Sequence, residues 1–381
     1  RREKKERERV ERQERKKRRK ERNMRESREG DNTKEMRKSE HHEGRDKRKD
    51  SESKDNGKEG VEEKIIKRNL HIMMLKRKIE KEIAMGNTIV IKPAEQTPLT
   101  AMLFAQICHE SGVPNGVVNI INGAGDTGAM LAAHEGVNKV AFTGSTIVGR
   151  AIRLATAGQG KKLTLELGGK SAFIVFEDAD LDAVVEGLVD SIWFNQGEVC
   201  CAGSRLLVQA PVAEQLHAKL KIRMQQLRTG SPLDKSIDVG SLVSQQQYAR
   251  VDALVSAGLL EGGQAYQAHD KNSQQNYYPP TLITDVDSSH PLVQEEIFGP
   301  VMSILKFTDE DEVIARANDT EFGLAAGVFS QDISRAHRVI NQMQAGICWI
   351  NSWGDSPAEM PVGGYKQSGI GRENGPETLH H

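Results

Sequence analysis

From about Gly60 onward, amphipathic helical patterns alternate with short runs of β-branched residues, and this alternation is the strongest constraint on the fold. It is typical of βαβ units, in which helices connect the strands of a largely parallel sheet. The alternation predicts a half-Rossmann arrangement first and a second α/β series over residues 172–350. The first arrangement has predicted strands at 88–91, 117–121, 139–142 and 164–166, and predicted helices at 98–111, 127–134 and 148–155.

The predicted helix 98–111 has a clear apolar face. Large apolar side chains recur in it at helical spacing, and Gly112 follows as a stop signal. The residues of this face are Leu99, Met102, Leu103 and Ile107.

The charge of the 381-residue chain is divided unevenly along its length. Residues 1–80 hold 31 Lys and Arg against 20 Asp and Glu, and the remainder holds 22 against 34, so the overall net charge is only −1. Residues 1–59 contain no Phe, Trp, Tyr or Pro and cannot bury enough apolar surface to offset chain entropy. We therefore expect a charged tail at 1–59, either disordered or a single solvated helix.

The basic run at 1–28 allows two further hypotheses beside the solvated tail that we favour. One is a nuclear-targeting segment, and the other is a weak contact with a polyanion, which would be electrostatic and strongly salt-dependent. No aromatic residue is interleaved for base stacking.

The four cysteines show no Cys-x-x-Cys spacing, and no cleavable signal or apolar run of membrane-spanning length occurs. These features favour a reducing, cytoplasmic location without membrane contact. The histidines also lack metal-ligand spacing, so no metal site is expected.

Glu166 and Cys200 lie 34 residues apart, each beside glycines, and together indicate covalent catalysis on a carbonyl. A thiolate is the strongest side-chain nucleophile near neutral pH, and a carboxylate can activate the water that releases the product. The alternatives are a small buried apolar residue for Cys200 and a charge at a strand end for Glu166.

Two segments indicate a dinucleotide site. Gly144 and Ser145 follow a strand and open a helix, where backbone N–H groups favour a phosphate, although a plain helix cap would explain them equally well. Lys92 and Glu95 follow the strand 88–91 at the sheet edge where α/β folds bind ligands. Glu95 suits ribose hydroxyls and so favours NAD over NADP, whereas the alternative for this pair is a surface ion pair.

These segments, together with Glu295–Pro300 and Pro361–Gly369, resemble the NAD(P)-dependent aldehyde dehydrogenase superfamily over about residues 60–380. Residues 351–375 are most similar to betaine aldehyde dehydrogenases. The resemblance implies an α/β fold with a partial Rossmann-type NAD-binding domain at 60–167 and an α/β catalytic domain at 168–365. The charged tail 1–59 precedes these domains and a C-terminal segment, 366–381, follows them.

The resemblance also implies a reaction, in which NAD oxidises an aldehyde to a carboxylate through a cysteine thiohemiacetal and thioester. Cys200 would be the nucleophile and Glu166 the general base. Trp353 would hold a quaternary ammonium group by cation–π attraction, unless it is simply packed in its loop. The implied cofactor contacts are Lys92, Glu95, Gly125, Gly144, Ser145, Leu167, Glu296 and Phe298, and the implied substrate contacts are Phe194 and Trp353.

The chain departs from the family pattern at the oxyanion loop. Asn69 occupies the position of the family's oxyanion donor, but Lys67, Arg68 and His71 replace the flanking prolines and tryptophan. The alternative for this stretch is an amphipathic helix, because five apolar residues share one helical face. Those residues are Ile65, Ile72, Leu75, Ile79 and Ile83.

The family's first hundred or so residues and its final strand have no counterpart in the sequence, and in relatives they complete the sheet and bridge subunits. We expect exposed apolar surface as a result, and a homo-oligomer stays possible although the family's subunit-bridging elements are missing. A second function therefore stays open: a catalytically impaired family member that binds a dinucleotide or a protein.

Overall fold

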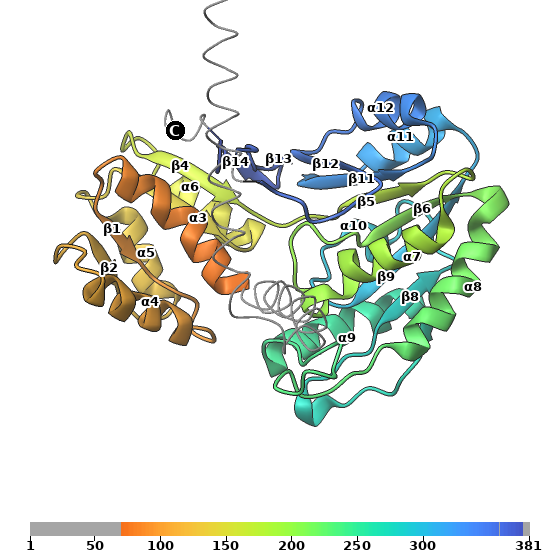
Figure 1. Ribbon diagram of the computed structural model, residues 1–381, viewed down its shortest axis with the longest axis horizontal. Helices are drawn as coiled ribbons and strands as arrows, with labels where there is room; N and C mark the ends of the chain where they lie inside the picture. Colours follow the sequence, from red (N-terminus) through yellow and green to blue (C-terminus); the bar gives the residue numbers. More distant parts are fainter. Residues whose placement is uncertain (1–69, 358, 376–381) are drawn as a thin grey trace, which may run out of the picture. The chain divides into compact units, whose positions relative to one another are not determined.

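The computed structural model describes residues 70–357 and 359–375 (Figure 1). The predicted tail at 1–59, its polyanion contact and the proposed oxyanion donor Asn69 lie outside the described residues. The helix α3 (Leu70–Ala84) begins directly after Asn69, so the described part of that stretch is helical, with Ile79 buried at 3% exposure.

The elements before residue 170 alternate as the sequence predicts, and their boundaries differ from the predicted ones by one or two residues. Short runs such as Ile89–Ile91 form strands because β-branched side chains favour the extended backbone. After α3 these elements are β1 (Ile89–Ile91), α4 (Leu99–Glu110), β2 (Val118–Ile120), α5 (Gly125–Ala133), β3 (Lys139–Thr143), α6 (Thr146–Ala155) and β4 (Lys162–Glu166).

The four strands of this part pair in two separate sheets. β1 and β2 pair in parallel as a two-stranded sheet. β3 pairs in parallel with β4, and the C-terminal strand β14 (Gly369–Ile370) adds to β4 in the antiparallel direction. Glu166 thus ends a central strand between two partners, one of which lies about 200 residues further along the chain.

A seven-stranded sheet forms the larger part of the structure, with the order β12-β11-β5-β6-β9-β8-β7. All neighbouring strands are parallel except β7 and β8, which are antiparallel. Its strands are β5 (Ala172–Val175), β6 (Arg205–Gln209), β7 (Gln264–Gln267), β8 (Thr281–Thr284), β9 (Val301–Phe307), β11 (Ala325–Phe329) and β12 (Ile347–Ile350). A two-residue pair, β10 (Phe322–Gly323) and β13 (Tyr365–Lys366), lies outside it.

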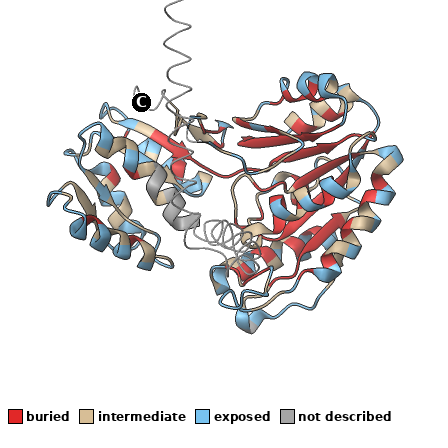
Figure 2. Cartoon of the chain, viewed as in Figure 1, coloured by how far each residue is buried: buried red, intermediate tan, exposed pale blue. Residues whose placement is uncertain are grey.

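Helices cover both faces of the seven-stranded sheet, which is why its inner strands β5, β6, β9 and β11 are buried almost throughout, whereas the edge strand β7 is not (Figure 2). One apolar core lies under α7 and α8 and contains Trp193 and Leu216. The second lies under α11 and α12 and contains Phe307 and Val339. The helices are α7 (Leu181–Leu188), α8 (Ala210–Gln226), α9 (Gln245–Leu260), α10 (Pro291–Gln294), α11 (Glu310–Asn318) and α12 (Ile333–Ile340).

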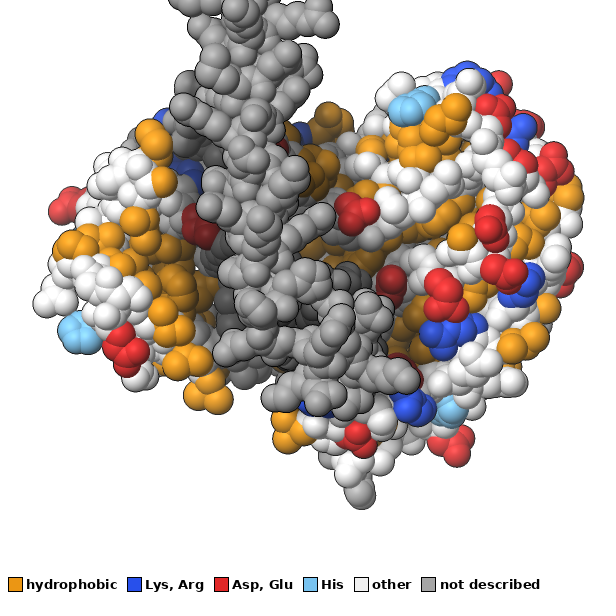
Figure 3. All heavy atoms as spheres, in the orientation of Figure 1, with side chains coloured by type: hydrophobic (Ala, Val, Ile, Leu, Met, Phe, Trp, Pro, Cys, Tyr) orange, Lys and Arg blue, Asp and Glu red, His pale blue; other side chains and the backbone are white. Residues whose placement is uncertain are grey.

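Helix α4 begins and ends one residue inside its predicted bounds, and Gly112 just beyond it adopts a φ of +78°, but the predicted apolar face is not buried. The buried side chains of α4 are instead the small Ala101 and Cys108. Hydrophobic side chains gather on the surface over this region, at the lower left of Figure 3. The exposed fractions of the four predicted face residues are 81% for Leu99, 44% for Met102, 53% for Leu103 and 48% for Ile107.

Candidate active site

The turn between β4 and β5 brings three distant segments together because it has glycine at two consecutive positions. A Cβ atom on Gly168 would lie 2.3 Å from Oε2 of Glu296, and one on Gly169 would lie 2.4 Å from the carbonyl oxygen of Cys200. No side chain fits at such distances. The two glycines therefore allow Glu296 and the backbone of Cys200 to approach the strand end that carries Glu166.

Glu296 is fixed to this turn by a hydrogen bond, which the Gly169 N–H donates to its Oε1 at 3.0 Å. Burial raises the pKa of Glu296, while that hydrogen bond opposes the rise. Phe298, two residues later, has a φ of 57°, in the left-handed region, and its carbonyl accepts a hydrogen bond from the Gln247 side chain at 2.8 Å. Residues 296–298 are thus held by a hydrogen bond at each end.

The loop before Cys200 has an unusual backbone. Asn195, Gln196 and Gly197 have successive φ values of 50°, 58° and 72°, which only glycine adopts without strain. The Asn195 amide side chain donates to the Glu198 carbonyl at 3.0 Å, and Oε1 of Gln196 accepts from the Gly240 N–H at 3.1 Å. These two hydrogen bonds hold the loop before Cys200 in its strained backbone conformation.

Cys200 is half-buried and faces acidic groups. The pKa of its thiol is raised well above the usual value by a hydrogen bond with the neighbouring Cys201, by burial, and by the charges of Glu166 and Glu296. The predicted pair of Cys200 and Glu166 therefore lies within electrostatic reach of each other. At neutral pH the sulfur is a thiol, and it needs a base to become nucleophilic.

Glu166 has the properties of such a base. Its side chain is buried at 8% exposure, and its Oε1 has no hydrogen-bond partner among the described residues. Burial, together with the negative charge of Glu373, raises its pKa to about 7. A carboxyl group that titrates near neutrality can both accept and release a proton under physiological conditions.

Two residues that the sequence did not predict complete the surroundings of Glu166. Glu373, buried at 6% exposure, accepts a hydrogen bond from Nζ of Lys78 on α3 at 2.6 Å. The two residues are 295 positions apart, and the sequence assigns a role to neither. The pairing of β14 with β4 helps to bring the C-terminal segment beside the base.

The predicted phosphate site is a capped helix N-terminus. Oγ of Ser145 accepts a hydrogen bond from the Val148 N–H at 3.4 Å, as the alternative interpretation of a plain cap expects. Gly144 donates its N–H to the Glu166 carbonyl at 3.0 Å, which ties this helix to the strand of the base. Leu167 packs closely against α6, because a Cβ on Gly149 would lie 2.5 Å from its side chain.

Lys92 and Glu95 also lie close to each other. Nζ of Lys92 donates to the carbonyls of Pro93 and Gly123, at 2.8 and 2.9 Å, and lies 3.8 Å from the Glu95 carboxylate. The Glu95 side chain is 46% exposed and therefore accessible to a ligand. Gly125, at the start of α5, has open space where a Cβ would lie.

Three aromatic side chains gather beside the cysteine loop. The ring of Trp353 lies 6.1 Å from the Phe194 ring, at an interplanar angle of 61°, and 6.1 Å from the Trp349 ring, at 50°. The Trp353 indole N–H donates to the carbonyl of Cys201 at 3.2 Å. The two predicted substrate contacts are thus neighbours, and one is bonded to the residue next to the nucleophile.

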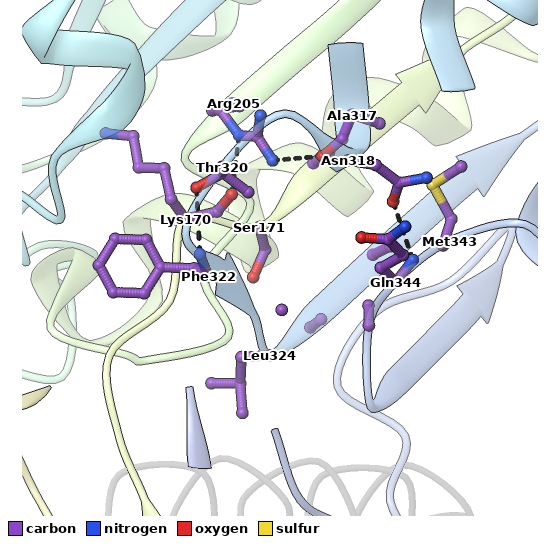
Figure 4. Close-up of a pocket in the computed structure, with 15 residues that line it drawn as sticks. Lys170, Ser171, Arg205, Ala317, Asn318, Thr320, Phe322, Leu324, Met343 and Gln344 are labelled. Atoms are coloured by element: carbon purple, nitrogen blue, oxygen red, sulfur yellow. Dashed lines mark hydrogen bonds between the residues drawn. The ribbon is translucent and has the colours of Figure 1, made fainter. Parts of the chain in front are cut away.

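A separate pocket lies at the end of α11 (Figure 4). The Arg205 guanidinium donates to the carbonyls of Lys170, Arg316 and Ala317, which leaves it little capacity for a ligand. Burial and the charge of Arg205 lower the pKa of Lys170 to about 7. We assign this pocket to the stability of the fold, because Arg205 satisfies helix-end carbonyls there.

Neither a metal centre nor a membrane span is found in the described part of the chain. Within residues 70–357 and 359–375, no three His, Cys, Asp or Glu side chains are grouped so as to hold a metal ion. None of the helices in those ranges is both long and apolar enough to cross a bilayer.

Comparison with known proteins identifies the family. The model of the aldehyde dehydrogenase family matches residues 33–381, and the chain belongs to this family. It is 47% identical over 320 residues to a betaine aldehyde dehydrogenase of Vibrio vulnificus, which covers 82% of this chain and 65% of the relative.

Solved structures agree with this assignment. A betaine aldehyde dehydrogenase of Staphylococcus aureus, crystallised with NAD⁺, matches with a TM-score of 0.79 at 37% identity, over 81% of this chain and 62% of the other. An aldehyde dehydrogenase of Bacillus cereus matches with a TM-score of 0.78 at 42% identity, over 80% and 63% of the two chains. The predicted α/β aldehyde dehydrogenase fold is confirmed. The chain spans 65% of the length of the curated relatives that it matches.

Proposed function

We propose that the chain is an NAD-dependent aldehyde dehydrogenase that oxidises an aldehyde to a carboxylate. One observation carries this proposal: the glycine turn 168–169 gathers Glu166, Cys200 and Glu296 around one point. A nucleophile, a base and a second acidic group then serve one reacting carbon.

The first step is the attack of Cys200 on the aldehyde. Glu166 in its carboxylate form takes the thiol proton, and the sulfur forms a bond to the carbonyl carbon. The negative charge that develops on the oxygen needs hydrogen-bond donors, for which we propose the Asn69 side chain and the Cys200 amide. Such a donor contributes about 10²-fold or more to the rate of acyl transfer.

The residues around the turn fit a dinucleotide. The Glu95 carboxylate is exposed for ribose hydroxyls, the open face of Gly125 leaves room for an adenine, and the start of α6 at Ser145 suits a phosphate. Glu296 and Phe298 would hold the other end of the cofactor beside Cys200. When bound, NAD accepts the hydride that leaves the substrate carbon.

The second half of the reaction releases the product. Glu166 takes a proton from water, the resulting hydroxide oxygen bonds to the thioester carbon, and the Cys200 sulfur leaves and takes that proton from Glu166. Before this half of the reaction Glu166 must release the thiol proton that it took in the first step. Glu373 and Lys78 form a hydrogen-bonded pair near Glu166, which supports a route for that proton toward the surface. The raised pKa of Glu166 suits it to both proton transfers.

We propose betaine aldehyde as the substrate, since relatives with 37 to 47% identity carry that name. The rings of Phe194, Trp349 and Trp353 support this choice. A quaternary ammonium group cannot donate a hydrogen bond, and a cation gains about 0.5 to 2 kcal/mol over an aromatic face.

One experiment tests the activity and the substrate. Purified wild-type chain is incubated with NAD and either betaine aldehyde or a neutral alkyl aldehyde of similar size, and NADH formation is followed. We expect activity in wild type and Cys201→Ala, loss of at least about 10³-fold in Cys200→Ala, and a higher kcat/KM for betaine aldehyde.

The outcomes separate the alternatives. No NADH from a folded wild-type chain would contradict the proposed activity, and NAD binding without turnover would support the binding-only function instead. Equal kcat/KM values for the two aldehydes would contradict the substrate assignment alone. We also propose a cytoplasmic location. The polyanion hypothesis gains no support from the relatives and is not part of the proposal.

A further inference from the structure

One face of α3 carries three charged side chains close to the proposed base Glu166. Lys78, Lys81 and Glu82 lie three and four positions apart and so share a helical face. Lys78 pairs with Glu373 at 2.6 Å, and Glu82 pairs with Lys139 on β3 at 2.8 Å. Lys81 therefore lies between two ion pairs that fasten α3 to β3 and to the C-terminal segment.

Lys81 and Glu166 are both left with an unsatisfied atom. Nζ of Lys81 is buried and has no hydrogen-bond partner within the part of the chain that the structure describes, and the same is true of Oε1 of Glu166. A buried polar atom without a partner costs about 1 to 3 kcal/mol, and more if it is charged. An unsatisfied donor and an unsatisfied acceptor in one cluster indicate that they serve each other.

The other charges of the cluster already have contacts. Lys78 and Lys139 have their carboxylates, and the Arg372 guanidinium donates to the carbonyls of Gly364 and Gly371 and lies over the Tyr365 ring. The opposite charges that act most on Lys81 are Glu373 and Glu82, and each of these already pairs with another lysine. Among the described residues around Lys81, Glu166 is the carboxylate that no lysine or arginine pairs with.

We propose that Lys81 is the counterion of ionised Glu166, reached through one water, and so acts as a positioning residue for the base. This inference rests on the proposed function, because it concerns the same site. It adds a residue that lies outside every motif used above. The consequence is that Lys81 controls the pH at which Glu166 becomes active.

The direction of this effect follows from the charges that face Glu166. Burial and Glu373 raise its pKa to about 7, whereas Lys78 and Lys81 on α3 and Arg372 on the C-terminal segment lower it. Removal of the Lys81 charge therefore raises the pKa of Glu166 further. Less carboxylate is then present at neutral pH.

The first test needs no cofactor. Wild type, Lys81→Met, Lys81→Arg and the exposed control Lys235→Met are assayed for hydrolysis of p-nitrophenyl acetate between pH 5 and 9, a range of about two units on each side of the Glu166 pKa. On the acidic side of the pH profile, called the acid limb here, the rate falls as Glu166 is protonated. We expect Lys81→Met to shift the midpoint of this acid limb to higher pH by roughly half to one unit, at the low end of the effect of one nearby charge. Lys81→Arg restores the wild-type limb, and Lys235→Met leaves it unchanged.

A second measurement applies even if the chain does not hydrolyse the ester. The urea midpoints of wild type, Lys81→Met, Glu166→Gln and the double variant form a double-mutant cycle. We expect the Lys81→Met shift to be at least halved in the Glu166→Gln background. Identical acid limbs, or shifts that are simply additive, would overturn the inference. Ester hydrolysis without NAD reduction would contradict the proposed function but not the role of Lys81.

Discussion

At the scale of single residues, the site depends on buried acidic groups that titrate near neutrality. Glu166 and Glu198 both have pKa values raised to about 7, chiefly by burial. Glu198 lies two residues before the nucleophile, and its Oε1 accepts from the Val243 N–H at 3.1 Å. The carboxyl groups that give this site its chemistry therefore also reduce the stability of the protein once they ionise.

The Glu166→Gln variant measures that cost. A carboxyl group whose folded pKa lies above its unfolded value contributes stability below the unfolded pKa, and this contribution is lost as the pH rises through the folded pKa. We expect the free energy of unfolding of wild type, relative to Glu166→Gln, to fall by about 3 kcal/mol between pH 4 and pH 8. Urea unfolding at a series of pH values checks this, and a constant difference would contradict it.

The sequence predicts that Glu166 and Cys200 serve one reaction because each lies in a distinctive motif, and in the structure the charge of Glu166 is among the causes that raise the pKa of the Cys200 thiol. It missed Lys78 and Glu373 because their pairing spans 295 positions and nothing local marks either residue as a neighbour of the base. It also did not indicate that the pKa of the Cys200 thiol would be raised, because that shift arises in the folded chain from the hydrogen bond with Cys201, from burial, and from the charges of Glu166 and Glu296.

At the scale of elements, helices and strands were predictable from periodicity, but their pairing was not. The predicted strand 139–142 is β3 (Lys139–Thr143), and the predicted strand 88–91 is β1. One edge of β4 pairs with β3, its neighbour in the chain, and the other pairs with β14, which comes from the far end of the chain. Strand pairing between distant segments leaves little trace in local sequence.

The glycine turn gives a prediction at this scale. In Gly169→Ala the new Cβ would lie 2.4 Å from the Cys200 carbonyl oxygen, a backbone atom that cannot rotate away. We expect a loss of about 1 to 3 kcal/mol in stability and at least a 10-fold loss of activity. Unfolding and NADH assays on the same preparation check both values.

Gly128→Ala is the matched control, because a Cβ there would meet the Lys92 side chain at an ordinary distance of 3.5 Å. That residue lies inside α5, where alanine stabilises by about 0.5 to 1 kcal/mol relative to glycine. If Gly169→Ala and Gly128→Ala change stability and NADH formation to the same extent, the close approach of the Cys200 backbone to Gly169 is not what determines the geometry of the site.

At the scale of the whole molecule, the surface of α4 is the least expected feature. Periodicity identified its apolar residues, but periodicity does not say what covers them, and in the described residues Leu99 is 81% exposed. Other apolar side chains of the elements before residue 170 are also exposed, among them Val90, Met130 and Leu154. Large apolar patches promote association between molecules.

We expect the double variant Leu99→Gln, Leu103→Gln to remain monomeric at higher concentration than wild type and to bind less of a hydrophobic dye. Because both side chains are more than half exposed, its stability should change by no more than about 0.5 kcal/mol per site. Light scattering and urea unfolding provide the two readings. A large loss of stability would show that α4 is packed against something within the folded chain.

The hydrogen bond from the Trp353 indole to the Cys201 carbonyl gives the protein an intrinsic fluorescent probe next to Cys200. Indole emission responds to hydrogen bonding and to nearby polar groups, and of the three tryptophans of the chain Trp193 and Trp349 are buried in the core. Loading an acyl group onto the adjacent sulfur would alter the Trp353 signal, so single-turnover kinetics could be followed without any label.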